Sequence, residues 1–330
     1  MALVLSQNQI EYASELLMQN HPVALPSETV YGLAARLSSD VAMTRVFELK
    51  ARPTFDPLIV HVLDLEMARP LVLKFGQVQR VLAEKFWPGP LTLLFEKSQV
   101  VSDLCTAGSG FVAIRCPENV LFRKAIELVG EPLAAPSANR FKGVSPVDYS
   151  DVLTELGRFG LSAVVDGGRS VLGLESTVIK VDEDQKLVQI LRPGAVSKES
   201  LKEALPEGFV VEQATSFLDQ NSPQLSPGTA AKHYSPSVPV EFTDTYDLNN
   251  VSDTEIHLFV LEKDFSSLEL KPTNYIVLGK TDSEAAANLF RVLRRIDQEK
   301  NYSKIIAHKS SDSGLGLAIN DRLQRAAGLV

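Results

Sequence analysis

The sequence predicts a mixed α/β protein in which a large first part is followed by a second, smaller α/β unit. Short apolar runs typical of buried strands alternate with helical patterns over residues 10–205. A stretch rich in turn-forming residues follows at 220–228, and strands spaced by helices return beyond it. With 330 residues, 45% of them hydrophobic and 22% charged, the chain is long enough for two cores.

The chain opens with a helix and a short strand that lead into a polar block. Ser6 and Gln9 have the spacing of a capping box, and apolar residues then recur on one helical face. A buried strand at 23–25 follows and stops at a proline. The block Ser27-Glu28-Thr29-Val30-Tyr31-Gly32-Leu33 is therefore expected at a strand end.

A second helix is expected to start at caps offered by residues 38–40 and to end near Lys50, so that Lys50 and Arg52 sit at its exit. A hairpin over 177–191 and a helix capped by Ser197 close the first part. Between them, strand-like runs lie at 58–62, 91–95, 111–115, 132–135 and 162–165.

Beyond the turn-rich stretch, the alternation of strands and helices favours a small parallel sheet. Gly314 and Gly316 lack the third glycine of a dinucleotide-binding fingerprint, so we expect a loop before the last helix there. A helical pattern covers 283–299, and the expected strands lie at 238–242, 256–261, 275–278 and 304–307.

Composition and charge narrow the function classes. A net charge of −8 opposes sustained binding to a nucleic-acid backbone unless a strong local basic patch is present. The two cysteines, Cys105 and Cys116, have no zinc-ligand spacing, so reduced thiols are expected. The apolar opening of the chain is short and no later window reaches membrane length, so a cytoplasmic protein without membrane contact is expected.

Several charged residues stand where an anionic ligand would need them. Lys50 and Arg52 could both engage a triphosphate, although an isolated pair is more often a solvated pair at a helix C-terminus. Arg115 lies in an apolar strand and needs an anion nearby, either an acidic side chain or a ligand carboxylate. His61 closes another apolar strand, as an edge residue or as a ligand-binding residue.

Polar residues also follow other strands. Ser137 and Asn139 come after the run at 132–135, while Ser176 and Arg192 flank the hairpin. Each alone is typical of a polar turn, but such residues also let backbone amides approach a phosphate or ribose. The sequence has no Walker loop, no His-Glu-x-x-His helix and no nucleophile elbow. The residues themselves predict an anionic ligand, a nucleotide foremost, in a cleft of an α/β domain.

At these motifs the chain resembles the threonylcarbamoyl-AMP synthase family in its longer two-domain form. The resemblance implies a YrdC-like twisted mixed sheet with helices at 1–212, a linker folding over the active site at 213–237, and a C-terminal Rossmann-like α/β domain at 238–330. It rests on Lys50-x-Arg52, Ser137-x-Asn139, the block from Ser27 to Leu33, Asp166-Gly167-Gly168, and Ser226-Pro227-Gly228 to His233-Tyr234-Ser235-Pro236.

The resemblance further implies a reaction in which L-threonine, bicarbonate and ATP, accompanied by Mg²⁺, give threonylcarbamoyl-AMP and pyrophosphate. The product would pass to a separate tRNA threonylcarbamoyl transferase complex that modifies the adenosine beside the anticodon. The synthase itself would then need no stable grip on tRNA. No covalent nucleophile and no metal site built from side chains are expected, and no side chain is an obvious general base.

Carried over position by position, the resemblance divides the candidate residues into sets. The expected catalytic cations are Lys50 and Arg52. The expected L-threonine site is formed by Thr29, His61, Arg115, Ala135 and Ser176, with Arg115 on the carboxylate. The expected ATP site is formed by Arg52, Asp56, Ser137, Asn139, Ser145, Arg192 and Tyr234.

The linker departs from the family pattern at Thr229 to Ala231, where relatives usually carry a methionine after the glycine and a tyrosine before the Lys-His pair. We expect this linker to be mobile without ligand and ordered with the adenylate.

Two other functions are compatible with the sequence. One is a carbamoyl-adenylate-forming maturation enzyme, although those chains are longer and carry zinc fingers. The other is a non-catalytic RNA-binding or ribosome-maturation module, which would bind RNA without ATP turnover.

Overall fold

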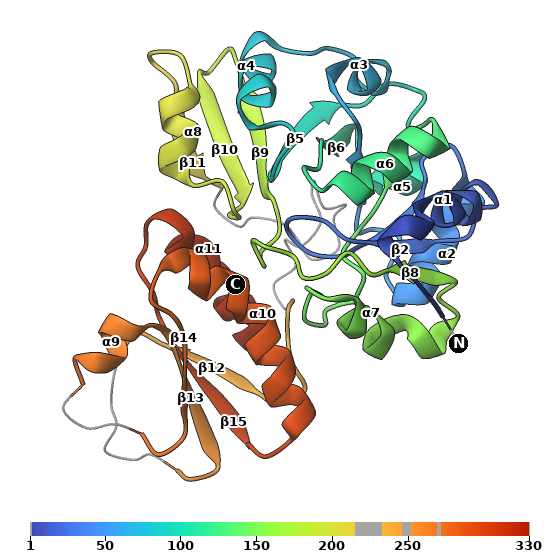
Figure 1. Cartoon of the computed structure of the whole chain (residues 1–330). Helices are drawn as coiled ribbons and strands as arrows, with labels where there is room; N and C mark the ends of the chain where they lie inside the picture. The colour runs from blue at the N-terminus through green and yellow to red at the C-terminus, as the bar shows by residue number, and fades with distance from the viewer. Residues whose placement is uncertain (1, 215–232, 246–251, 269–271, 330) are drawn as a thin grey trace.

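The computed structural model describes residues 2–214, 233–245, 252–268 and 272–329 (Figure 1). The turn-rich stretch at 220–228 and the family departure at Thr229 to Ala231 lie outside the described residues, so the expectations about the linker stay predictions. The described strands form one sheet of eleven strands and one of four.

The first sheet is mixed, with parallel and antiparallel pairs along its width. Three of its strands escaped the sequence patterns because they are too short or too uniformly apolar to show alternation: β1, β3 and β11. Across the sheet the strands are β1 (Leu3–Leu5), β8 (Ala163–Val165), β2 (Val23–Leu25), β3 (Gly32–Arg36), β7 (Leu133–Ala134), β4 (Ile59–His61), β6 (Phe111–Arg115), β5 (Leu91–Glu96), β9 (Thr177–Asp182), β10 (Leu187–Arg192) and β11 (Val210–Gln213).

The helices of the first part start at the expected caps. Ser6 and Gln9 form the capping box, Ser39 accepts from the backbone N–H of Ala42, and Ser197 accepts from that of Ser200. Three short 3₁₀ segments cover Gln7–Gln9, Arg69–Leu71 and Gly157–Phe159. The α-helices are α1 (Ile10–Met18), α2 (Asp40–Lys50), α3 (Leu65–Ala68), α4 (Gln77–Phe86), α5 (Asp103–Thr106), α6 (Val120–Val129), α7 (Tyr149–Leu156) and α8 (Lys198–Ala204).

The second sheet is parallel throughout, as the alternation of strands and helices predicted. Its order is β12 (Val240–Thr243), β15 (Lys304–His308), β13 (Glu255–Leu261) and β14 (Tyr275–Gly279), and its helices are α9 (Glu262–Ser266), α10 (Asp282–Glu299) and α11 (Gly314–Ala327). The expectation of a loop at Gly314 and Gly316 was wrong, because both lie in the first turn of α11. Gly316 packs so closely on Ser311 that a Cβ would collide with it.

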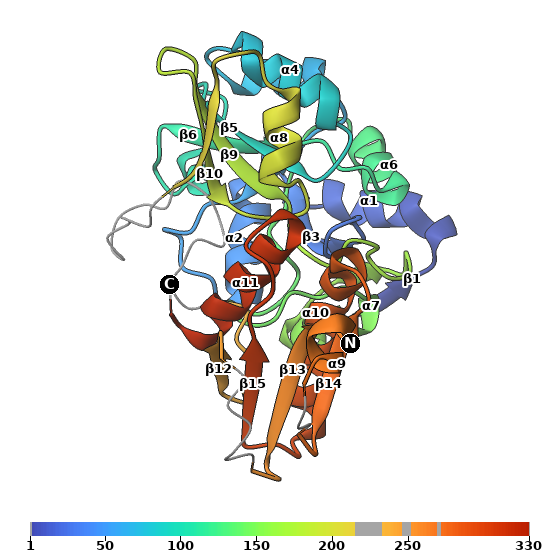
Figure 2. The ribbon, with the colours of Figure 1, turned by 90° about the vertical axis from the view of Figure 1, so that its left-hand side faces the viewer.

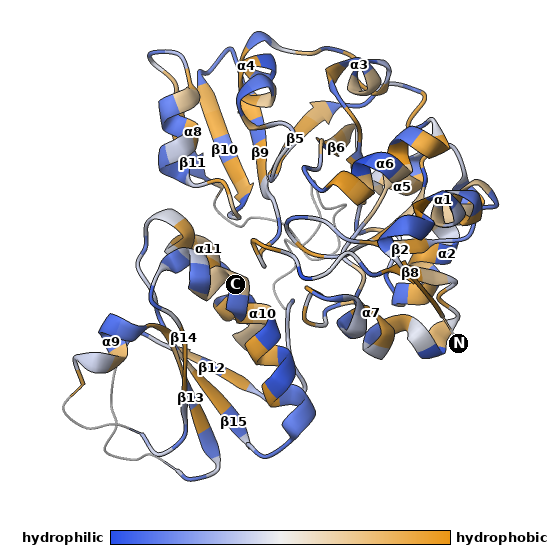
Figure 3. Cartoon of the chain, viewed as in Figure 1, coloured by the Kyte–Doolittle hydropathy of each residue, from blue (hydrophilic) through white to orange (hydrophobic). Residues whose placement is uncertain are grey.

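The strands of both sheets consist mostly of hydrophobic residues, whereas hydrophilic residues recur along the helices (Figure 3). Helices α10 and α11 lie between the small sheet and the large unit (Figures 1 and 2). Their core cluster, around residues such as Phe290 and Leu323, also contains residues of the first part: Val30, Val144, Val147 and Leu174. Buried apolar contact therefore joins the two units beside the loops that carry the candidate site. Among the described helices, none combines the length and the apolar character needed to span a membrane.

Candidate functional site

One pocket collects residues from strand ends, from loops and from the described end of the expected linker. The expected site residues on its wall are Thr29, Arg52, His61, Arg115, Ala135, Ser137, Ser176, Arg192 and Tyr234. The remaining wall consists of Ser27, Val30, Gly32, Ile59, Phe122, Pro136, Glu175 and His233. Strands β3, β4, β6, β7, β9 and β10 bring these residues together from segments far apart in the sequence.

Arg115 is held rigidly at the end of β6. Its Nη2 lies 2.5 Å from Glu28 Oε1, its Nη1 donates to Thr29 Oγ1 at 2.8 Å, and its Nε donates to the carbonyl of Gly89 at 3.2 Å. Burial would raise the pKa of Glu28, but the charge of Arg115 holds it below its ordinary value. The anion that the sequence required is thus Glu28, and the fixed guanidinium still borders the pocket.

His61 forms an uncharged part of the same wall. Its Nδ1 lies 3.1 Å from the carbonyl oxygen of Ile59, and its ring stacks on Phe122 with centroids 4.8 Å apart. Burial, reinforced by the positive charge of Arg115, lowers the pKa of His61 to about 3. A neutral imidazole is therefore present at working pH, and it adds no positive charge for a phosphate.

The lowered pKa of His61 predicts a contribution to acid instability. Between pH 6.5 and about 3 the unfolded chain binds a proton here that the folded chain does not. The free energy of unfolding therefore falls as pH falls through this window. For His61→Asn, we expect the loss between pH 7 and pH 5 to be about 2 kcal/mol smaller than in the wild type. Urea unfolding at both pH values measures it; equal losses in the two proteins would contradict the prediction.

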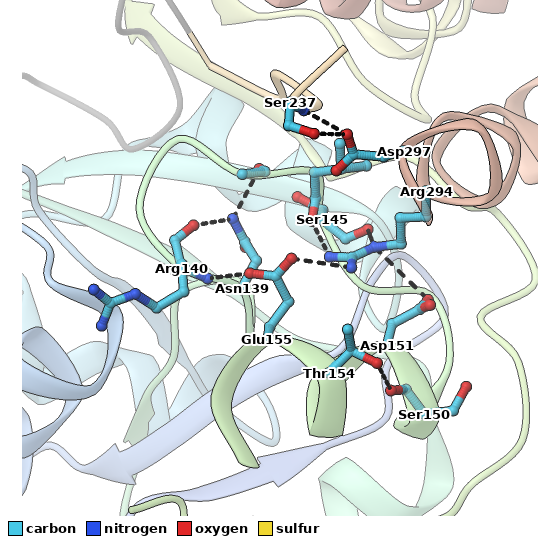
Figure 4. Close-up of polar contacts among 12 residues, drawn as sticks. Asn139, Arg140, Ser145, Ser150, Asp151, Thr154, Glu155, Ser237, Arg294 and Asp297 are labelled. Atoms are coloured by element: carbon cyan, nitrogen blue, oxygen red, sulfur yellow. Dashed lines mark hydrogen bonds and ion pairs between the residues drawn. The ribbon is translucent and has the colours of Figure 1, made fainter. Parts of the chain in front are cut away.

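The segment after β7 forms the next part of the wall. Ser137 pairs with Gly32 across an isolated bridge, and Leu33 donates its N–H to the carbonyl of Pro136 at 2.8 Å. The side chain of Asn139 accepts from Ser137 Oγ at 2.5 Å and donates to the carbonyls of Arg140 and Gly143 (Figure 4). Asn139 therefore shapes this loop from behind the pocket.

Lys50 also lies behind the wall, not on it. It is buried at the end of α2, and its Nζ donates to the carbonyl oxygens of Ser137 at 2.6 Å and Asn139 at 2.5 Å. Burial, together with the charge of Arg52, puts the pKa of Lys50 well below its ordinary value. Its contacts fix the backbone of the Ser137 loop.

Arg52 reaches the wall because α2 ends at Lys50, two residues earlier. Ala51 adopts a left-handed conformation with φ of 48°, which turns the chain. Arg52 then donates to the carbonyls of Asp56 at 3.1 Å and Pro57 at 2.7 Å, and its Nη2 lies 2.8 Å from Asp56 Oδ1. Asp56 therefore anchors Arg52 from outside the pocket wall.

The two hairpin ends meet, as the sequence suggested. Arg192, at the end of β10, donates from Nη2 to the carbonyl of Ser176 at 2.9 Å and to its Oγ at 3.1 Å. Ser176 Oγ also lies 2.7 Å from Thr92 Oγ1. Gly194 permits this contact, because a Cβ there would collide with the backbone of Glu175. This contact joins Ser176, of the expected threonine site, to Arg192, of the expected ATP site.

Tyr234 closes the pocket from within the expected linker at 213–237. It is buried with φ of 59°, and its ring lies 5.4 Å from that of Phe290 on α10. Its Oη has no hydrogen-bond partner among the described residues, although it borders the pocket. Burial raises the pKa of Tyr234, so the hydroxyl is a neutral group available to a ligand.

The structure separates the expected residues into a wall and a layer behind it. Lys50, Asp56, Asn139 and Ser145 lie in that layer and bond to or support wall residues. The sequence patterns missed the pocket residues Phe122 and His233, the carboxylates Glu28 and Glu175, and Arg322. Glu28 and Glu175 stand inside motifs that were singled out, and an acidic residue beside a strand-end hydroxyl could have identified them. No sequence signal marked Arg322.

The chemistry of this pocket is that of an anion-binding site. Arg52, Arg115 and Arg192 supply fixed positive charge, while hydroxyls and a neutral imidazole occupy the space between them. In the part of the chain that the structure describes, no group of three or more acidic, histidine or cysteine side chains could hold a metal ion. Fold and site thus define a two-unit α/β protein with a pocket for a small ligand carrying several negative charges.

The chain belongs to the threonylcarbamoyl-AMP synthase family. A family model described as "Telomere recombination" matches residues 15–194, and one described as "Threonylcarbamoyl-AMP synthase, C-terminal domain" matches 196–328. The threonylcarbamoyl-AMP synthase of Pyrococcus abyssi is 34% identical over 97% of this chain and 94% of its own. That of Bacillus subtilis is 36% identical over 97% of this chain and 93% of its own.

The fold of the chain is also similar to that of a solved structure. The crystal structure of P. abyssi Sua5 complexed with L-threonine matches with a TM-score of 0.85 and 30% sequence identity. The match covers 100% of this chain and 98% of that one. The expected fold, a large mixed sheet with helices followed by a small parallel α/β unit, is confirmed.

Proposed function

We propose that this chain is an L-threonylcarbamoyladenylate synthase, a nucleotidyltransferase that makes threonylcarbamoyl-AMP and pyrophosphate from L-threonine, bicarbonate and ATP. The observation that carries the proposal is one pocket bordered by Arg115 with its hydroxyl neighbours and by Arg52 and Arg192. Its relatives bear the name of this activity, and the matching P. abyssi structure holds L-threonine.

The threonine half is centred on Arg115, which we assign to the amino-acid carboxylate. Glu28 and Thr29 fix the guanidinium before the ligand arrives, so little ordering cost is left for binding. Thr29 and Ser176 offer hydroxyls to the substrate, and Ala135 with neutral His61 limits its size. This set orients the threonine amine toward the nucleotide half.

The ATP half is assigned to Arg52, Ser137, Arg192 and Tyr234 on the wall, with Asp56, Asn139 and Ser145 behind them. Two arginines facing one space can neutralise the charge that develops on the phosphates. Mg²⁺ is the expected companion of ATP. Because the described residues offer no metal cluster, the phosphates and water would supply most of its ligands.

In the proposed reaction the threonine amine attacks the carbon of bicarbonate, and water leaves to give a carbamate. A carbamate oxygen then attacks the α-phosphorus of ATP while pyrophosphate leaves. Neither His61 nor His233 suits the role of general base, because burial lowers the pKa of both. The amine proton is therefore assigned to water or bicarbonate. The pocket contributes positioning and fixed charge.

The product is expected to leave for a separate tRNA threonylcarbamoyl transferase complex in the cytoplasm. The net charge of −8 suits a synthase that does not itself hold tRNA.

Incubation with labelled bicarbonate, L-threonine and ATP-Mg²⁺ tests the proposed activity, and chromatography separates the products. Labelled threonylcarbamoyl-AMP should form only when all three substrates are present. The proposal would be refuted if no labelled adenylate formed with all three.

Lys50 is proposed to act through the Ser137 loop instead of touching phosphate. Lys50→Met should raise the KM for ATP by about tenfold, because two buried carbonyls lose the donor that holds them, a loss worth about 1–3 kcal/mol. The KM for threonine should change by less than about threefold. Steady-state pyrophosphate release measures both constants. An unchanged KM for ATP, in a variant with the wild-type unfolding temperature, would contradict this role.

A further inference from the structure

Arg322 contacts residues of the pocket wall from the second unit. It lies on α11 and is fully buried, with its Nε 2.8 Å from Glu175 Oε2 and its Nη2 donating to the carbonyl of Pro193 at 2.9 Å. Its Cζ stands 5.0 Å from the centre of the Tyr234 ring. One guanidinium thus contacts three segments that carry pocket residues.

Glu175 is the acidic side chain on a wall that otherwise carries positive charge. Its Oε1 accepts from Ser145 Oγ at 2.5 Å, and its Oε2 is paired with Arg322. An unpaired carboxylate at this place would repel a triphosphate. The pairing with Arg322 neutralises that carboxylate and keeps it directed at Ser145.

A second arginine of the same unit supports the backbone at this point. Arg294, on α10, donates from Nε to the carbonyl of Ser145 at 3.3 Å and from Nη2 to the carbonyl of Val144 (Figure 4). Its Nη1 lies 3.1 Å from Glu155 Oε1 on α7. Ser145 is therefore held through its backbone by α10 and, by way of Glu175, through its hydroxyl by α11.

We propose that Arg322 is a positioning residue for the ATP half of the pocket, where it neutralises Glu175 and fixes it against Ser145. The C-terminal unit then completes the phosphate-binding side of a site whose other residues come from the first part and the linker. The inference rests on the proposed function, and it gives the second unit a chemical task in the reaction.

The test compares Arg322→Met, Glu175→Gln and the double variant in the full chain. Arg322→Met leaves Glu175 unpaired, so the KM for ATP should rise tenfold or more while the KM for threonine stays within about twofold. In the double variant Glu175 no longer carries a charge that repels phosphate, and Asp321, the other carboxylate paired with Arg322, keeps its ion pair with Arg325. Most of the ATP defect should therefore disappear, and the two substitutions should be strongly non-additive. Arg295→Ala, an exposed change on α10, is the matched control and should leave both constants unchanged.

The outcomes separate this role from a purely structural one. Equal or additive ATP defects in the single and double variants would overturn the proposal, and so would a fall in kcat with both KM values unchanged. Should Arg322→Met fail to fold, Arg322→Lys replaces it, and its ATP defect should be smaller but equally relieved by Glu175→Gln. Calorimetric binding of a non-hydrolysable ATP analogue gives the same comparison without turnover. Failure of the reaction in the wild type and failure of the Arg322 role are thereby distinguished.

Discussion

Arg115→Ala is expected to reduce kcat/KM for L-threonine by about 100-fold or more, the largest effect of any single substitution on the amino-acid half. The variant loses the cation assigned to the carboxylate, and it leaves Glu28 as a buried, unpaired negative charge beside it. Removing one partner of a buried ion pair typically destabilises the folded protein by about 3–5 kcal/mol. The measurement is pyrophosphate release at saturating ATP and varied threonine.

Arg36→Ala is the matched control for that experiment. Arg36 also ends a strand of the first sheet and pairs with a glutamate, Glu131, but this pair is partly exposed to solvent and lies away from the pocket. Exposed pairs contribute about 0–1 kcal/mol, so its kinetics should stay close to those of the wild type. A KM for threonine within about threefold of the wild type in Arg115→Ala would remove Arg115 from the carboxylate site.

Arg52→Ala is expected to lower kcat for pyrophosphate release by about 100-fold, comparable to the loss of one preorganised donor in other enzymes. Arg52 is held by two carbonyls and Asp56 before any ligand binds, so its charge is available to the transition state without reorganisation. Single-turnover measurement with both substrates saturating isolates this step from binding.

Arg45→Ala serves as the control for Arg52, because Arg45 lies on α2, the helix that precedes Arg52, and donates to the carbonyl of Asn20, outside the pocket. It should retain turnover within about twofold. Near-normal turnover in Arg52→Ala would show that the developing phosphate charge is neutralised elsewhere, and Arg192 would then be the first candidate.

Strand-end chemistry was largely predictable from the sequence. Pro26 directly follows β2, and Ser27 and Thr29 beyond it lie on the pocket wall, as the strand end predicted. Arg52 was expected at the exit of a helix, and it lies on the wall just after α2 ends. The missed strand β3 shows the limit of this approach. Its residues are nearly all buried, so they carry no alternating pattern, and its pairing with β2 and β7 depends on distant segments.

The site features that the sequence did not predict depend on contacts between residues far apart in the chain. Lys50 had the correct neighbours in sequence, but its burial depends on carbonyls 87 and 89 residues away. Arg322 lies 147 residues from Glu175, and nothing in its helical surroundings distinguishes it from a surface arginine. Such charges can be assigned only once the packing of α10 and α11 on the first part is known.

The most direct measurement of the central claim is pyrophosphate release by the purified full chain with ATP, Mg²⁺ and bicarbonate, with and without L-threonine. A site with a threonine half and a triphosphate half predicts release that requires threonine and saturates with it. Release at the same rate without threonine would contradict the account.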